Sequence, residues 1–130
     1  MFLIPAEDSF EKLKWASKNS ELINGNDFKA IVGGDSAGGN LATVVTMMAR
    51  DRKGPAIYAQ VLLYPVTNLS CDTESYYEFA ERLKESGVQV QYEHEQGLVY
   101  VYFSDYSIFK ERIRGTIEII KNFLREQKRV

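Results

Sequence analysis

Residues 33–40 read Gly-Gly-Asp-Ser-Ala-Gly-Gly-Asn, and this stretch decides the fold. The five residues before it, 28–32 (Phe-Lys-Ala-Ile-Val), are mostly apolar and too few for a helix, which predicts a short buried strand. Residues 41–50 contain alanine, leucine and methionine without a helix breaker, which predicts a helix. A Gly-x-Ser-x-Gly sequence between a strand and a helix is typical of a sharp turn that lifts the serine hydroxyl clear of the sheet. We therefore expect Ser36 at the apex of such a turn.

The chemistry expected of this turn is nucleophilic. Gly34 and Gly38 are predicted to flank the bend, where larger side chains would clash with the incoming strand and the outgoing helix. The N–H of Ala37 belongs to the start of the helix, where N–H groups have no intrahelical partner and stabilise negative charge. Ser36 is thus a candidate nucleophile and Ala37 a candidate oxyanion donor. The alternative is a glycine-rich connection with an ordinary surface serine.

The same stretch resembles a known family. Residues 34–40 are similar to the nucleophile motif of the hormone-sensitive-lipase-like esterases, the alpha/beta hydrolase fold-3 family. Residues 60–66 (Gln-Val-Leu-Leu-Tyr-Pro-Val) resemble the next strand of that family, and residues 80–88 resemble the helix and strand start before its catalytic histidine loop. The resemblance implies a carboxylic ester hydrolase that forms an acyl-enzyme and uses no cofactor. The motif residues beside Ser36 are Gly34, Asp35, Gly38 and Gly39.

The rest of the chain alternates between helix and strand patterns. Further helices are expected over residues 5–18, from Asp72 or Thr73 to 86, and over 107–127; further strands are expected over 57–64, 88–92 and 98–103. The nearly continuous apolar run at 57–64 favours a strand buried on both faces of a parallel sheet. This order predicts a partial three-layer α/β fold, with a mostly parallel sheet flanked by helices. We expect residues 1–130 to form a single domain that is incomplete by the family's standard.

Composition narrows the choice of partners. The net charge of −2 gives no electrostatic reason to expect nucleic acid. The single cysteine, Cys71, excludes an internal disulfide and has no neighbours at metal-ligand spacing, so no metal site is expected. No stretch reaches the roughly 20 apolar residues of a membrane span. A cytoplasmic location is the expectation.

The catalytic base is harder to find. A serine hydroxyl needs a base, usually histidine, and an acid that orients the base. The chain has one histidine, His94. The resembled family has a Gly-x-x-His loop; here Gly97 matches the glycine, but Tyr100 occupies the histidine position. Because tyrosine has a pKa of about 10, it stays protonated at neutral pH. His94 is therefore the candidate substitute base, and a plain surface or strand-end histidine is its alternative.

The acid and the oxyanion loop have no clear counterpart. The resemblance places the family's aspartate in a block between the strand at 57–64 and the helix at residue 80, and this sequence has no room for that block. Its His-Gly-Gly-type oxyanion loop has no match either. The carboxylates left as stand-ins are Asp72, Glu74, Glu93, Glu95 and Asp105. Losing one oxyanion donor costs about 100- to 1000-fold in rate, and losing the base costs about a million-fold, so we predict impaired catalysis.

Two functions follow from these observations. The first is a serine esterase for small uncharged esters, with His94 as its base. The second is a catalytically inactive relic of the family that binds a ligand or a partner, with uncovered sheet edges or helix faces buried in a homo-oligomer. A phosphate-binding loop is disfavoured, because no lysine follows Gly39 and the glycine spacing is wrong for a dinucleotide site.

Overall fold

The computed structural model describes residues 4–25, 30–67, 73–94 and 96–127. The chain divides into two compact units, Met1–Pro65 and Val66–Val130, and each is described by itself. Whether the chain acts as a single domain stays a prediction. Several expected features lie outside the described residues: the first two residues of the strand at 28–32, the helix cap at Asp72, Cys71, and the carboxylate Glu95.

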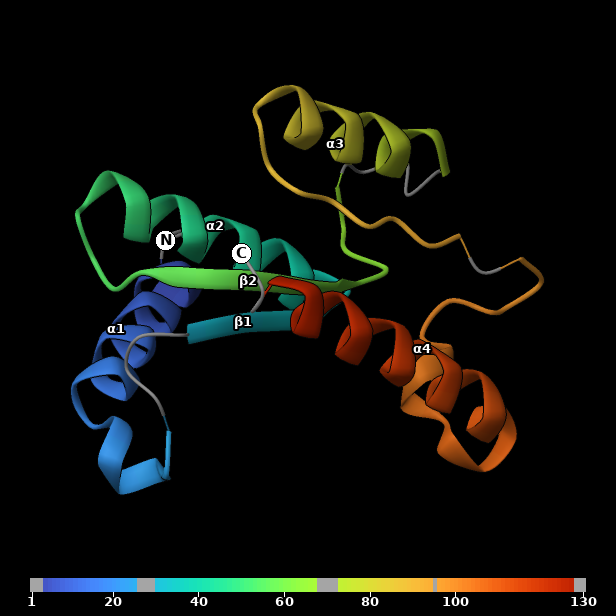
Figure 1. Ribbon diagram of the computed structural model, residues 1–130, viewed down its shortest axis with the longest axis horizontal. Helices are drawn as coiled ribbons and strands as arrows, with labels where there is room; N and C mark the ends of the chain where they lie inside the picture. Colours follow the sequence, from blue (N-terminus) through green and yellow to red (C-terminus); the bar gives the residue numbers. More distant parts are fainter. Residues whose placement is uncertain (1–3, 26–29, 68–72, 95, 128–130) are drawn as a thin grey trace. The chain divides into compact units, whose positions relative to one another are not determined.

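The first unit is built on a parallel pair of strands (Figure 1). Its elements are α1 (Ile4–Lys18), a short 3-10 helix (Ser20–Ile23), β1 (Ala30–Asp35), α2 (Ala37–Asp51) and β2 (Ile57–Leu63). The strands pair in parallel from Ala30 opposite Ile57 to Asp35 opposite Leu63. Because parallel neighbours need a crossover, α2 connects them and packs against both. The predicted α/β class with a parallel sheet and flanking helices is confirmed.

The turn within the glycine-rich stretch is shorter than the sequence predicts. β1 continues to Asp35, and α2 begins at Ala37 rather than at residue 41. Ser36 alone lies between the strand and the helix. The strand and the helix therefore meet at a single residue, which makes the bend sharp.

The core of the first unit lies between α1 and α2. Phe10, Val45 and Ala49 are buried there, and Leu13, Met48 and Ile57 pack around them. Because α1 packs on α2, the sheet receives little cover from α1. β2 is half-buried at every residue, which is less than the full burial expected on both faces.

An ion pair joins α1 to the end of α2. Arg52 donates from both terminal nitrogens to the Glu7 carboxylate, at 2.7 Å each. The hydrogen bond from Arg52 lowers the pKa of Glu7. The stabilisation is therefore present above the ordinary glutamate pKa and is lost as the pH falls through the lowered value. Both side chains are exposed, so the contribution is small.

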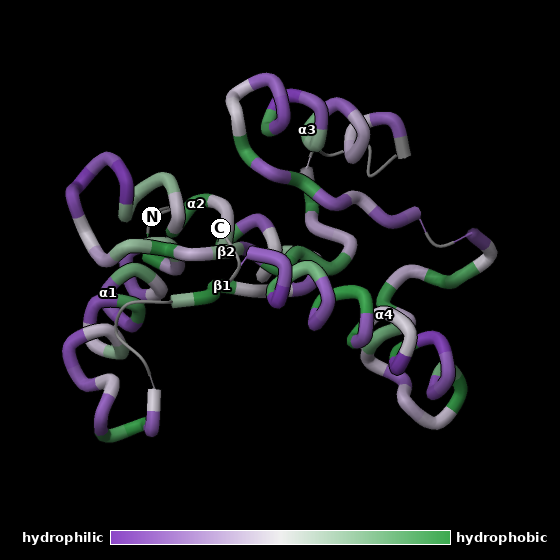
Figure 2. The backbone as a smooth tube through the Cα atoms, in the orientation of Figure 1, coloured by the Kyte–Doolittle hydropathy of each residue, from purple (hydrophilic) through white to green (hydrophobic). Residues whose placement is uncertain are grey.

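The second unit is helical in its described part. It contains α3 (Thr73–Glu85), a 3-10 helix (Tyr102–Ser104) and α4 (Tyr106–Gln127), which has a non-helical residue at Phe109. Polar and apolar residues alternate along α4 (Figure 2), as expected for an amphipathic helix. Ile113 is its buried residue. The helices predicted at 73–86 and 107–127 are confirmed.

The two strands predicted in this unit are wrong. Residues 88–92 form no ladder within the described residues, and Tyr92 packs beside Tyr77 of α3 with ring centroids 4.7 Å apart. A segment of alternating polar and apolar residues forms a strand only where a partner strand is present to pair with it. In residues 98–103, Val101 has a φ of 65°, which ends any extended run. Tyr102 is buried, and its hydroxyl lies 2.9 Å from the hydroxyl of Thr116 on α4.

No helix in the described part of the chain is long and apolar enough to cross a membrane.

Candidate active site

Ser36 has the strained backbone that the motif predicts. Its φ of 51° and ψ of −121° lie in a region that residues other than glycine seldom adopt. Such a conformation costs about 1 to 3 kcal/mol and persists only where surrounding structure imposes it. The Ser36 N–H donates to the Leu63 carbonyl at 3.0 Å, and the Ser36 carbonyl accepts from Gly39 at 3.1 Å. The sheet and the helix thus hold the residue from both sides.

The Ser36 side chain does not cap the helix. The residue stands at the N-cap of α2, where a serine hydroxyl usually accepts a hydrogen bond from a backbone N–H of the first turn. No such side-chain bond forms here. The Ser36 hydroxyl therefore does not have the capping role that is usual at this position.

Two glycines allow the strand and helix to approach. A Cβ added at Gly34 would lie 2.3 Å from the backbone carbon and oxygen of Gly38. A Cβ added at Gly39 would lie 2.8 Å from the Cβ of Pro65. The expectation that Gly38 also excludes a side chain is wrong. A Cβ there would meet only Asp35 Oδ1, at 3.8 Å, which is ordinary van der Waals contact.

The positive end of α2 lies beside the serine. Ala37 is the first residue of α2, so its N–H has no intrahelical partner by position. Asp35 is the last residue of β1 and is exposed. A carbonyl oxygen placed at Ser36 would meet the partial positive charge of the helix N-terminus. The role of Ala37 as an oxyanion donor stays a prediction.

His94 and Tyr100 belong to the second unit. The His94 ring stacks on Tyr77 with centroids 6.4 Å apart and an interplanar angle of 14°. His94 is exposed, and Tyr100 is 48% exposed. The structure therefore places the His94 ring beside Tyr77 of α3, in a segment that forms no strand. Its role as a base stays a prediction.

Sequence reasoning missed the neighbours of His94. His94 lines a pocket of about 320 Å³. The other residues that line this pocket are Tyr77, Ala80, Glu81, Lys84 and Tyr92. The four from α3 recur at spacings of three and four residues, which places them on one helix face. That spacing could have been found in the sequence, but nothing there indicated that His94 packs on this face.

Two of the stand-in carboxylates have other partners. Asp105 accepts hydrogen bonds from the backbone N–H and hydroxyl of Ser107 and from the N–H of Ile108, so it caps the start of α4. The Ser107 hydroxyl is the main cause of its lowered pKa. Glu93 accepts a hydrogen bond from Gln91 at 2.8 Å. Glu74 is exposed near the start of α3, and Asp72 and Glu95 lie outside the described residues.

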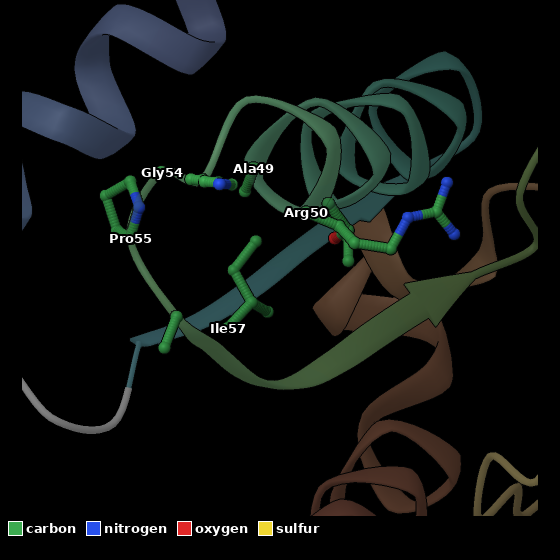
Figure 3. A pocket seen from close by; sticks show the side chains of 8 residues that line it. Ala49, Arg50, Gly54, Pro55 and Ile57 are labelled. Carbon is green, nitrogen blue, oxygen red and sulfur yellow. The ribbon is translucent and has the colours of Figure 1, made fainter.

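A second hollow lies at the opposite end of α2 from Ser36 (Figure 3). It measures about 280 Å³ and is lined by Thr46, Ala49, Arg50, Lys53, Gly54, Pro55, Ala56 and Ile57. Ala49 is thirteen residues beyond Ser36, which on a helix corresponds to roughly 20 Å. This hollow therefore cannot hold an ester that reacts at Ser36.

Comparison with known proteins identifies the class. The alpha/beta hydrolase fold family matches residues 2–80, which is more than half of the chain, and the chain belongs to this family. Carboxylesterase NlhH of Mycobacterium tuberculosis is 37% identical over 75 residues, covering 58% of this chain and 24% of that protein. The ethyl acetate hydrolase of Pseudomonas putida is 34% identical over 71 residues, covering 54% of this chain and 22% of that protein.

Solved esterase structures are similar to part of this chain. A thermostable esterase from Pseudomonas putida ECU1011 is 35% identical with a TM-score of 0.49, covering 58% of this chain and 24% of that one. Carboxyl esterase 2 of Tuber melanosporum is 32% identical with a TM-score of 0.49, covering 59% and 25%. The chain spans about a quarter of the length of the curated relatives it matches.

Proposed function

We propose that Ser36 is the nucleophile of a carboxylic ester hydrolase that acts on small uncharged esters. The observation that carries the proposal is the positive φ of Ser36 at a one-residue turn between β1 and α2. The chain belongs to the alpha/beta hydrolase fold family, and relatives similar to it are named esterases. This supports the same reaction.

In the proposed reaction, Ser36 Oγ attacks the acyl carbonyl carbon, and its proton passes to the base. The carbonyl oxygen takes the electron pair of the C=O bond, and the N–H of Ala37 donates a hydrogen bond to it. The tetrahedral intermediate then expels the alcohol, which takes the proton from the base and leaves an acyl-enzyme. Water then attacks the acyl carbonyl carbon of the acyl-enzyme and gives its proton to the base. The bond to Ser36 Oγ breaks, the acid leaves, and Ser36 Oγ takes the proton back from the base. We assign the base to His94.

The proposed enzyme is slow. The chain has one oxyanion donor assigned, Ala37, and its base comes from outside the family's histidine position. We expect turnover well below that of a complete serine hydrolase, because a missing oxyanion donor alone costs about 100- to 1000-fold.

The proposal predicts a specific loss of activity. In hydrolysis of p-nitrophenyl acetate and butyrate, Ser36→Ala should reduce the rate to the buffer background, because the reacting atom is removed. His94→Ala should reduce it by about 100- to 10,000-fold, or to background, as expected for a general base. A Ser36→Ala variant with the wild-type rate would contradict the proposal. Glu78→Ala serves as the control, since this exposed acid of α3 is not among the candidate catalytic acids and does not line the pocket that contains His94.

A second candidate function is an interaction through the sheet, and the exposure of β1 favours it. Ile31 is 47% exposed in this strand, although isolated two-stranded sheets are marginally stable and parallel sheets are usually covered. We propose that a second copy of the chain packs on this exposed face of the sheet. Light scattering should then give twice the mass of 14.9 kDa, and Ile31→Lys should lower it to the monomer. A monodisperse wild-type monomer at high concentration would exclude this function.

A further inference from the structure

Asp35 places a negative charge next to the candidate nucleophile. It is the last residue of β1 and directly precedes Ser36, so the Cα atoms of the two residues are about 3.8 Å apart. Exposed and half-buried residues alternate along β1, and Asp35 belongs to the exposed set together with Ile31 and Gly33. The Asp35 carboxylate is therefore in contact with solvent on the open face of the strand.

This carboxylate turns toward the start of α2. A Cβ added at Gly38 would lie 3.8 Å from Asp35 Oδ1, and Gly38 follows Ala37, the first residue of the helix. Ser36 itself is half-buried, and Ala37 is exposed. The Asp35 charge thus lies at the end of α2 where the proposed function places the carbonyl group of the ester.

No ion pair of the described residues neutralises Asp35. The basic residues at the end of α2 begin at Arg50, fourteen residues beyond Ser36, which on a helix corresponds to roughly 21 Å. The ion pairs of the first unit join other side chains: Lys14 with Glu11, Arg50 with Asp51, and Arg52 with Glu7. Asp35 is therefore the charge nearest to Ser36 along the chain, and its field acts on whatever reacts there.

We propose that Asp35 selects the charge of the compounds that react at position 36: it disfavours anionic acyl groups and favours neutral and cationic ones. The extension to ester substrates rests on the proposed function, whereas the charge selectivity at position 36 requires no catalysis. For two unit charges about 6 to 8 Å apart in a largely solvated site, Coulomb's law gives roughly a threefold change in rate. A cation and an anion should therefore differ by roughly tenfold.

The test of charge selectivity uses a thiol in place of the serine hydroxyl. In the full chain with Ser36→Cys and Cys71→Ser, residue 36 carries the only thiol. It is treated with the cationic trimethylammonium-ethyl and the anionic sulfonatoethyl methanethiosulfonates, and the ratio of the two rates is divided by the same ratio for 2-mercaptoethanol. Because both reagents react with the same thiolate, the ratio does not depend on the thiolate fraction.

At low salt the normalised cation-to-anion ratio should be roughly tenfold. Adding Asp35→Asn should bring it close to one, and Asp35→Glu should retain most of it. Salt at about 1 M, where the Debye length is about 3 Å, should remove the preference without any change of sequence. The salt series thus tests the inference even where a variant fails to fold.

Asp8→Asn is the matched control, because it removes the same charge from an exposed aspartate of α1. Asp8 is adjacent to Glu7, which pairs with Arg52 at the far end of α2 from Ser36. The ratio should not change in this variant. A normalised ratio near one with Asp35 present, or equal changes in Asp35→Asn and Asp8→Asn, would overturn the inference.

Ester hydrolysis by the chain with Ser36 separates this inference from the proposed function. The two substrates are neutral 4-nitrophenyl acetate and the anionic mono-4-nitrophenyl ester of glutaric acid. Asp35→Asn should raise the rate for the anionic ester relative to the neutral one by roughly threefold. Thiol selectivity in a chain that hydrolyses neither ester would support the role of Asp35 and reject the proposed function. Hydrolysis of both esters with a rate ratio that Asp35→Asn does not change would overturn the inference and leave the proposed function intact.

Discussion

Gly34→Ala is expected to destabilise the first unit by about 3 kcal/mol or more, at the upper end of overpacking effects. The added methyl group would lie 2.3 Å from the backbone carbon and oxygen of Gly38. These are main-chain atoms at the start of α2, so no side chain can rotate away to relieve the contact. The strand or the helix must move, and Ser36 moves with it. Urea denaturation followed by far-UV circular dichroism measures the loss.

Gly38→Ala is the matched control for this substitution. The same methyl group would meet only Asp35 Oδ1, at 3.8 Å, which is ordinary contact. Because alanine is favoured over glycine in a helix by about 1 kcal/mol, Gly38→Ala should be neutral or stabilising. Equal destabilisation by the two substitutions would show that the close approach of β1 and α2 at Gly34 is not formed.

Phe10→Ala is expected to cost about 3 to 5 kcal/mol, as truncation of a buried aromatic residue does. Phe10 is 3% exposed and packs on Val45 and Ala49 of α2. Its ring also closes the space beside Gly54, where an added Cβ would lie 3.0 Å from two ring carbons. A small domain has a stability of about 5 to 15 kcal/mol. The substitution therefore removes a large share of the stability of the first unit.

Trp15→Ala tests whether the stability cost of removing an aromatic side chain from α1 depends on its burial. Trp15 lies on the same helix but is 55% exposed, so its removal should cost far less than that of Phe10. The measurement is again urea denaturation monitored by circular dichroism. If Trp15→Ala costs as much as Phe10→Ala, then α1 does not pack on α2 through the Phe10 face.

The sharp turn at Ser36 could be predicted from the sequence, because the residues that form it are adjacent in the chain. A strand, a glycine-flanked serine and a helix are adjacent in the chain, and each imposes its own backbone geometry. The roles of the glycines were only partly predictable. Gly39 approaches Pro65, which lies 26 residues away, and the sequence does not indicate which helix face meets that residue.

The second unit was harder to predict, because its conformation depends on partners. The alternating residues 88–92 fit a strand, yet they pack on α3 through Tyr92 and form no ladder in the described part of the chain. Tyr102 fits a strand by composition, but its hydroxyl contacts Thr116 of α4 and its backbone follows a residue with positive φ. Pairing and helix docking are tertiary effects, and they override local propensity.

Intact-mass analysis after treatment with a fluorophosphonate probe tests the central claim most directly. The probe phosphonylates a serine only where the surroundings activate its hydroxyl, so the reaction reports the nucleophile without requiring a complete catalytic cycle. We predict one adduct on the wild-type chain, no adduct on Ser36→Ala, and slower labelling of His94→Ala. An unmodified mass for a folded wild-type chain, or the same adduct on Ser36→Ala, would contradict the assignment of Ser36 as the nucleophile.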